Sequence, residues 1–110
     1  MKLIDRSTLQ QRLGKAILVE ALPEKYWRDW HLPGARNLPH DQVRQLAPAL
    51  LPDKSAEIVV YCASATCQNS HIAGRVLEQM GYANVSVYPG GKQDWREAGL
   101  PTEGSAMAAA

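Results

Sequence analysis

Residues 57–70 run Glu57-Ile58-Val59-Val60-Tyr61-Cys62 and continue as Ala63-Ser64-Ala65-Thr66-Cys67-Gln68-Asn69-Ser70. The apolar, β-branched first half is typical of a buried strand, and a helical pattern follows the small, polar second half. Cys62 therefore lies where a strand turns into a helix. Backbone N–H groups and a helix N-terminus converge at such a turn and favour a thiolate, so we expect a lowered pKa for Cys62. A nucleophilic sulfur is the first hypothesis for this chain.

Strand and helix patterns alternate along the rest of the chain. Further strands are predicted at residues 2–4, 16–20, 36–38 and 85–88. We expect Ser7 to cap a helix over residues 8–13 and Asp41 to cap a later helix. The helix after Asp41 is predicted to face the core with Val43, Leu46, Ala47 and Leu50. The helix after Cys62 is predicted to do so with Ile72, Ala73, Val76, Leu77 and Met80. The alternation predicts a parallel sheet covered on both faces, with sites at the carboxyl ends of its strands.

Length and composition narrow the class of protein. The 110 residues fit one domain, which we expect over residues 1–104, with a flexible tail over residues 105–110. Twelve Lys and Arg balance eleven Asp and Glu, so neither nucleic acid nor a membrane is an expected partner. No stretch predicts a membrane span, and residues 1–6 do not open a signal peptide, so we predict a cytoplasmic location. The oligomeric state stays open.

The two cysteines are too few for a disulfide scaffold, so their reactivity matters more than their pairing. Cys67 and His71 are four residues apart on one helix face, which is a spacing that metal ligands use. Two further ligands are not evident in the sequence. We therefore expect neither a metal site nor a cofactor.

Four segments resemble the single-domain rhodanese-like (sulfurtransferase) family. The most specific is His31-Leu32-Pro33-Gly34-Ala35-Arg36-Asn37-Leu38-Pro39, which is close to the family's His-(Ile/Leu)-Pro-Gly-Ala-x-Asn-(Ile/Leu)-Pro. The others are residues 18–26, the strand ending at Cys62, and residues 81–101 with Tyr88-Pro89-Gly90-Gly91 and Asp94-Trp95. Together they cover roughly residues 15–103 in the family's order and spacing, and four motifs in register are far more specific than one.

The resemblance implies an α/β fold with a five-stranded parallel sheet flanked by helices on both faces. It implies that Cys62 takes a sulfane sulfur, becomes a persulfide and passes the outer sulfur to a thiol or other nucleophilic acceptor. The donor would be thiosulfate, a polysulfide, a low-molecular-weight persulfide or a protein persulfide, and no cofactor is needed. The substrate-binding loop would consist of Ala63, Ser64, Ala65, Thr66, Cys67, Gln68 and Asn69.

The loop departs from the family pattern. Sulfurtransferase loops commonly read like Cys-Arg-x-Gly-x-Arg, but those positions hold Ala63, Ala65 and Cys67, so the loop carries no formal charge. Thiosulfate, a dianion, thus loses its obvious clamp. The phosphatase-like branch of the fold needs an arginine at the position of Gln68, so phosphoryl or arsenate chemistry is not expected. The family's usual Asp-Val-Arg is replaced by residues 20–22, Glu-Ala-Leu.

Several residues admit two interpretations. Cys67 is either a resolving thiol for a persulfide or sulfenate on Cys62, or a small residue packed at the helix start. His71 either tunes a nearby thiol or is a solvent-facing or capping histidine. Glu20 either orients a neighbouring loop or acts as a general base. His31 is expected to fix its turn, and Trp27, Trp30 and Trp95 are expected to pack in the core and its rim.

Three hypotheses for the function follow. The first is a sulfurtransferase that uses Cys62 as a persulfide carrier. The second is a thiol redox or sulfur-relay module that uses Cys62 and Cys67, and the third is an interaction domain that kept the fold and lost the chemistry. The second cysteine motivates the redox module, and the uncharged loop motivates the interaction domain.

Overall fold

The computed structural model describes residues 1–104; the tail expected over residues 105–110 lies outside the described residues. The elements are β1 (Lys2–Leu3), α1 (Arg6–Arg12), β2 (Ile17–Glu20), α2 (Glu24–Asp29), β3 (Arg36–Asn37), α3 (Val43–Leu50), β4 (Glu57–Tyr61), α4 (Asn69–Gln79), β5 (Asn84–Tyr88) and α5 (Gly91–Glu97). Among these residues, no helix has the length and apolar character that crossing a bilayer requires.

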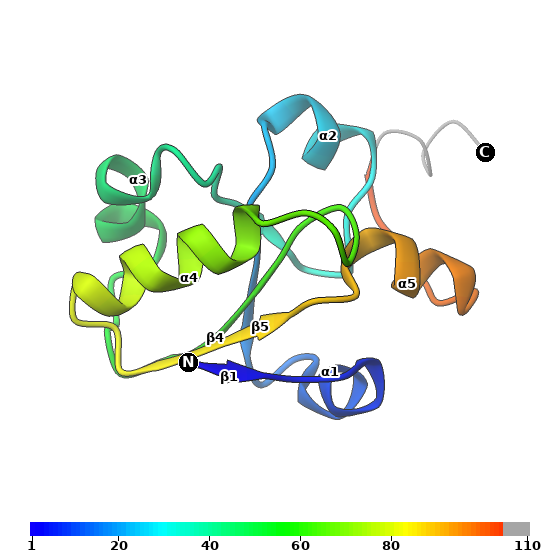
Figure 1. Ribbon diagram of the computed structural model, residues 1–110, viewed down its shortest axis with the longest axis horizontal. Helices are drawn as coiled ribbons and strands as arrows, with labels where there is room; N and C mark the ends of the chain where they lie inside the picture. Colours follow the sequence, from blue (N-terminus) through cyan, green and yellow to red (C-terminus); the bar gives the residue numbers. More distant parts are fainter. Residues whose placement is uncertain (105–110) are drawn as a thin grey trace.

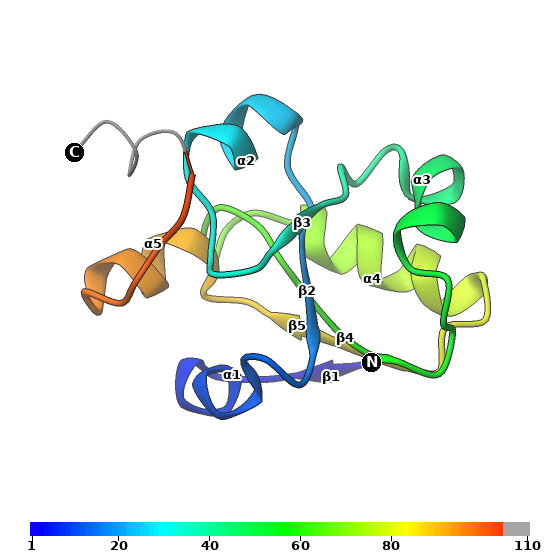
Figure 2. The same ribbon diagram turned by 180° about the vertical axis from the view of Figure 1, so that it is seen from behind.

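The five strands form one sheet in the order β1-β5-β4-β2-β3 (Figure 1 and, from behind, Figure 2). Every neighbouring pair runs parallel, which confirms the predicted parallel sheet. β4 is the central strand, so the residue that follows it lies between the ends of β2 and β5. Parallel strands place their carboxyl ends at one edge of the sheet, and that edge is where sites form in such folds.

The alternation of side chains along β4 explains why both faces of the sheet are covered. Ile58 and Val60 pack in a cluster with residues of α3 and α4. Val59 and Tyr61 point to the opposite face and pack with Leu9 of α1 and Trp95 of α5. In Figure 1, α4 lies above the sheet and α1 below it. The predicted helical layers on both faces are therefore confirmed.

Two predicted helix caps are wrong. α1 begins at Arg6, and its cap is Asp5, whose carboxylate accepts a hydrogen bond from the N–H of Thr8 at 2.8 Å. The prediction chose Ser7, which lies inside the first turn. α3 follows Gln42 with no side-chain cap, so the cap predicted at Asp41 is absent. Asp, Asn, Ser and Thr all suit a cap, and local sequence does not decide between neighbouring candidates.

Two residues predicted to face the core are exposed: Leu46 at 38% and Ile72 at 40%. The buried stripe of α4 consists of Ser70, Ala73, Gly74 and Leu77, which repeats at the spacing of one helix face. Ile72 lies outside that stripe. Three of these four residues are small, so α4 can pack close to the sheet. A prediction based on apolar residues alone does not identify Ser70 or Gly74 as core residues.

Candidate active site

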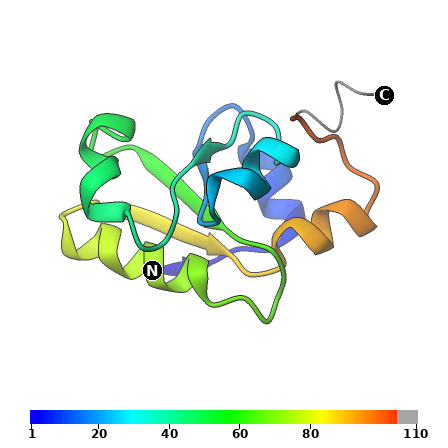
Figure 3. The same cartoon turned by 90° about the horizontal axis from the view of Figure 1, so that it is seen from above.

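Cys62 follows the last residue of β4 and is only 1% exposed. The loop from residue 63 to 68 leads from it into α4, which begins at Asn69. The predicted turn from strand to helix is therefore present, and it lies at the carboxyl edge of the sheet (Figure 3).

The thiol of Cys62 has two polar neighbours. Its Sγ lies 3.3 Å from the carbonyl oxygen of Cys67 and 3.4 Å from Oγ of Ser70, a buried residue in the first turn of α4. The N–H of Cys67 donates to the carbonyl of Ser64 at 3.1 Å, so the loop closes on itself around the sulfur. The loop thus brings Cys62, Cys67 and Ser70 together.

Burial raises the pKa of the Cys62 thiol, and the neighbouring Cys67 side chain raises it further. The hydroxyl and the N–H of Ser70 lower it, but they do not outweigh the burial. The expectation of a lowered pKa is therefore wrong for the resting protein. The physical reason is that the sulfur is removed from water while no cationic side chain of the described residues stands beside it.

The loop keeps several backbone donors free. Within the described part of the chain, the N–H groups of Ser64, Ala65 and Thr66 donate to no acceptor. Of the residues predicted to bind substrate, Ala63, Ala65, Thr66 and Gln68 are exposed, and Ser64, Cys67 and Asn69 are half-buried. Free N–H groups on an accessible loop are what an anion needs in the absence of charged side chains.

The start of α5 holds this loop from the other side. The N–H groups of Lys92 and Gln93 donate to the carbonyls of Cys62 and Ala63, both at 2.9 Å. Gly91 makes this approach possible: its φ is +66°, and a Cβ there would lie 2.5 Å from the carbonyl oxygen of Cys62. The position of the nucleophile therefore depends on α5 as well as on β4 and α4.

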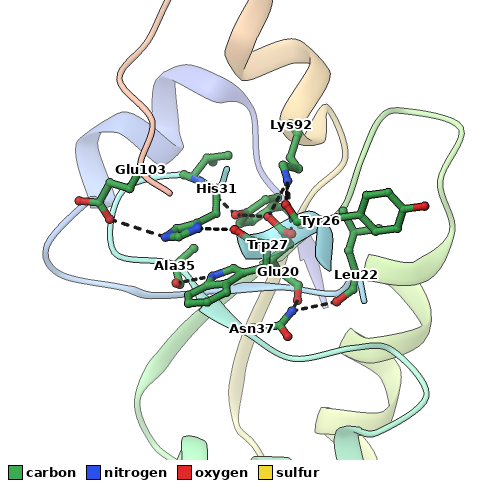
Figure 4. A network of polar contacts seen from close by, with 11 residues as sticks. Glu20, Leu22, Tyr26, Trp27, His31, Ala35, Asn37, Lys92 and Glu103 are labelled. Carbon is green, nitrogen blue, oxygen red and sulfur yellow. Dashed lines mark hydrogen bonds and ion pairs between the residues drawn. The ribbon is translucent and has the colours of Figure 1, made fainter. Parts of the chain in front are cut away.

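A buried polar network anchors α5 at this edge. Nζ of Lys92 lies 3.3 Å from Oε1 of Glu20 and donates to the carbonyl of Tyr26 at 2.9 Å (Figure 4). The hydroxyl of Tyr61 donates to Glu20 at 2.8 Å and accepts from the N–H of Leu32 at 3.1 Å. The network links β2, β4, α2 and α5 through side chains that solvent hardly reaches.

Burial is the largest influence on the pKa values of Glu20 and Lys92 in this network. It raises the pKa of Glu20, although Lys92 and Tyr61 act in the opposite direction, and it lowers the pKa of Lys92 despite the attraction of Glu20. The carboxylate of Glu20 contacts Lys92 and Tyr61, so it orients the segment that holds the loop, as the first interpretation of Glu20 expected.

The sequence interpretation missed Lys92. The signal that could have found it is Glu20 itself, because a carboxylate at the end of a buried strand needs a cation or strong donors. The family's usual arginine at position 22 is Leu22 here. Lys92 follows the Gly90-Gly91 turn of a recognised motif, but nothing local shows that its side chain reaches β2 from 72 positions away.

The other candidate residues have mainly structural contacts. His31 stacks on Trp27 with ring centroids 4.4 Å apart, and its Nδ1 lies 2.7 Å from the carbonyl oxygen of Trp27. Figure 4 shows this pair beside Glu103, whose backbone forms an antiparallel bridge with His31. Among residues 1–104, His71 makes no hydrogen bond to a thiol, and no three His, Cys, Asp or Glu side chains gather as metal ligands.

The comparison with known proteins agrees with this architecture. A family model for the rhodanese-like domain matches residues 5–98. An HTH-type transcriptional regulator from Mycobacterium tuberculosis is 32% identical over 102 residues, which cover 91% of this chain and 44% of the regulator. The thiosulfate:glutathione sulfurtransferase of Saccharomyces cerevisiae is 30% identical over 90 residues, which cover 72% of this chain and 63% of that enzyme.

A solved structure shows the same fold. The rhodanese-like domain of a protein from Anabaena matches with a TM-score of 0.86 and 26% identity, over 100% of this chain and 84% of that one. The chain therefore belongs to the rhodanese-like domain family. It spans less than two thirds of the length of the two curated relatives described above.

Proposed function

We propose that this chain is a sulfurtransferase that carries a sulfane sulfur as a persulfide on Cys62 and passes it to a thiol or other nucleophilic acceptor. The observation that carries the proposal is the position of Cys62, at the end of the central strand and inside a loop with free N–H groups. Membership of the rhodanese-like family and a relative named as a sulfurtransferase support it. We place this activity in the cytoplasm, where cysteines rest as thiols.

The reaction has two balanced half-steps. In the first, the thiolate of Cys62 attacks the outer sulfur of a donor, a new S–S bond forms on Cys62, and the donor's own S–S bond breaks. With thiosulfate the leaving group is sulfite; with an organic persulfide it is a thiolate. In the second, an acceptor thiolate attacks the outer sulfur on Cys62 and the Cys62 thiolate leaves. No net oxidation occurs in this exchange.

The loop suggests which donors suit this chain. Its residues carry no formal charge, and the side chain of Lys92, whose N–H donates to the carbonyl of Cys62, is already paired with Glu20. Backbone N–H groups then provide the cradle for the anionic persulfide, and the dianion thiosulfate has no guanidinium in the loop to clamp it. We therefore rank polysulfides and low-molecular-weight persulfides above thiosulfate as donors.

Intact mass spectrometry of the reduced protein tests this function. The protein is exposed in turn to thiosulfate, a polysulfide and glutathione persulfide, with Cys62→Ser as the control. We expect one added sulfur on the wild type and none on the control. Loading of Cys62→Ser, or no loading of the wild type by any donor, would overturn the proposal.

A second function has a specific observation in its favour. Sγ of Cys62 lies 3.3 Å from the carbonyl of Cys67, and the Cys67 side chain influences the pKa of Cys62, so the two thiols are neighbours. In a redox module, the Cys67 thiolate would attack the Cys62 sulfur of a sulfenic acid or a persulfide, forming a disulfide as the S–O bond breaks to release water or the S–S bond breaks to release hydrosulfide. Loss of two hydrogens after mild peroxide, absent in Cys67→Ala, would favour this function over simple sulfur transfer.

A further inference from the structure

The two cysteines of the Cys62 loop differ in their access to solvent. Cys62 is almost completely buried, whereas Cys67 is half-buried and lies between the exposed residues Thr66 and Gln68. In Figure 3 the segment between β4 and α4 (green) projects from the body of the molecule. A bulky acceptor that approaches this loop therefore reaches the side chain of Cys67 more easily than the nucleophile.

The side chains of the two cysteines are close enough to interact. The Cys67 side chain acts on the thiol of Cys62 through a hydrogen bond and through its charge, and both raise the pKa of Cys62. A hydrogen bond requires a close approach of the two groups. The loop maintains this approach, because the N–H of Cys67 donates to the carbonyl of Ser64 at 3.1 Å. Sulfur can therefore pass between residues 62 and 67 without leaving the protein.

Loading of Cys62 changes its contact with residue 67. In the resting protein, the S–H of Cys62 donates to the carbonyl of Cys67 at 3.3 Å. The inner sulfur of a persulfide has no proton to donate, so this hydrogen bond is lost and an electron-rich sulfur faces a carbonyl oxygen. The hydroxyl of Ser70, 3.4 Å from the sulfur, can still donate to it. Formation of the persulfide thus keeps Cys62 in place and releases the segment that carries Cys67.

The outer sulfur is the accessible atom of such a persulfide. An S–S bond places it about 2 Å beyond the enclosed sulfur of Cys62. The inner sulfur remains beside the buried Ser70, which restricts the approach of a nucleophile to it. Attack on the outer sulfur transfers that sulfur, whereas attack on the inner one gives a disulfide and releases hydrosulfide. The contacts of Cys62 therefore favour transfer.

We propose that Cys67 is a second sulfur carrier, which receives the outer sulfur from Cys62 and delivers it to the acceptor. This inference rests on the proposed function, because it requires a persulfide on Cys62. The thiolate of Cys67 attacks the outer sulfur of Cys62–S–S–H, a new S–S bond forms on Cys67, and Cys62 leaves as a thiolate while the proton stays on the transferred sulfur. An acceptor thiolate then attacks that sulfur and the Cys67 thiolate leaves, so no net oxidation occurs.

The position of the added sulfur is the first test. The protein is loaded with a limiting amount of polysulfide, its thiols and persulfides are alkylated, and fragmentation of the peptide that contains residues 62 and 67 locates the sulfur. We expect it on both cysteines of the wild type and on Cys62 alone in Cys67→Ser. Sulfur on Cys62 alone in the wild type would overturn the relay and leave the proposed function intact.

Release of sulfur from the loaded protein gives a second readout. A cysteine-containing peptide is the bulky acceptor, and cyanide is an acceptor small enough to reach Cys62 directly. In Cys67→Ser, the rate of release to the peptide relative to cyanide should fall about tenfold, while loading from polysulfide changes by less than about twofold. Cys67→Ala is the matched variant and should give the same ratio, because both substitutions remove the thiol.

The outcomes separate the relay from its alternatives. An unchanged ratio in Cys67→Ser, or a fall in Cys67→Ala alone, would overturn the relay, since the latter would mean that Cys67 acts through packing. Loss of two hydrogens and release of hydrosulfide after loading would replace the relay with the redox module. Failure of every donor to load the wild type would instead overturn the proposed function.

Discussion

Lys92 and Glu20, which are 72 positions apart in the sequence, form an ion pair of 3.3 Å at the edge of the sheet that carries Cys62. Both side chains are almost completely buried. The N–H of the same lysine donates to the carbonyl of Cys62. One residue thus joins the interior of the sheet to the backbone of the nucleophile.

Removing either partner of this pair should destabilise the protein strongly. Glu20→Gln or Lys92→Met leaves the other charge buried and unpaired, which typically costs about 3–5 kcal/mol of unfolding free energy. The double variant should lose clearly less than the sum of the two, as measured by urea denaturation. Strict additivity would contradict the coupling. Arg6→Gln, which breaks the exposed Arg6–Asp94 pair, is the control and should cost less than about 1 kcal/mol.

The reaction of Cys62 with iodoacetamide should accelerate as the pH rises above the ordinary thiol range. Burial holds the pKa of Cys62 above its usual value, so the thiolate fraction at neutral pH is smaller than in a free cysteine. The same raised pKa affects stability: its contribution is present below the ordinary thiol pKa and is lost as the pH rises through the raised one. The rate of alkylation is measured by mass spectrometry. If Cys62 reacted faster than free cysteine at pH 7, the raised pKa of Cys62 would be contradicted.

Ser70→Ala should slow that alkylation further. The hydroxyl of Ser70 lowers the pKa of Cys62, and a change of one pKa unit alters the thiolate fraction tenfold, so we expect a decrease of up to about tenfold at pH 7. Ser86→Ala is the matched control, since Ser86 is also buried but lies within β5. An equal effect of both substitutions would mean that Ser70 acts through packing alone.

Gly91→Ala should displace the Cys62 loop. The new Cβ would lie 2.5 Å from the carbonyl oxygen of Cys62, and the positive φ adds a backbone cost of about 1–2 kcal/mol. Gly99 has a similar φ of +73° but nothing within 4 Å of its Cβ position, so Gly99→Ala isolates the backbone cost. We expect Gly91→Ala to lose at least about 1 kcal/mol more than Gly99→Ala and to load sulfur more slowly. Equal losses would show that the close approach is not maintained.

The sequence predicted the sheet, its coverage and the place of Cys62, because these depend on local patterns. β4 shows this clearly: its run of apolar residues alternates between the two cores, and the polar loop after Cys62 marks the end of the strand. The motif with His31 likewise has a largely local basis, since Nδ1 of His31 lies 2.7 Å from the carbonyl oxygen of Trp27 and the N–H of Ala35 donates to the carbonyl of Leu32. Periodicity and turn chemistry are sufficient for such features.

The charge state of the site could not be predicted in this way. The sequence shows a helix start after Cys62, which favours a thiolate, but it does not show that the sulfur is turned away from water against Ser70. Desolvation depends on the packing of the whole edge of the sheet, and it decides the direction of the pKa shift. The contact between Lys92 and Glu20 likewise joins segments that are distant in the chain.

The order in which the parts of this edge leave the ribosome has a consequence of its own. α5, which closes over the backbone of Cys62, ends at Glu97, 35 positions after the cysteine. At about 5–20 residues per second, roughly 2–7 s separate the synthesis of Cys62 from that of the end of this helix. During this interval the thiol has neither its shield nor its raised pKa. Cys62 therefore gains its native environment late, only after α5 has been made and has docked on the backbone of residues 62 and 63.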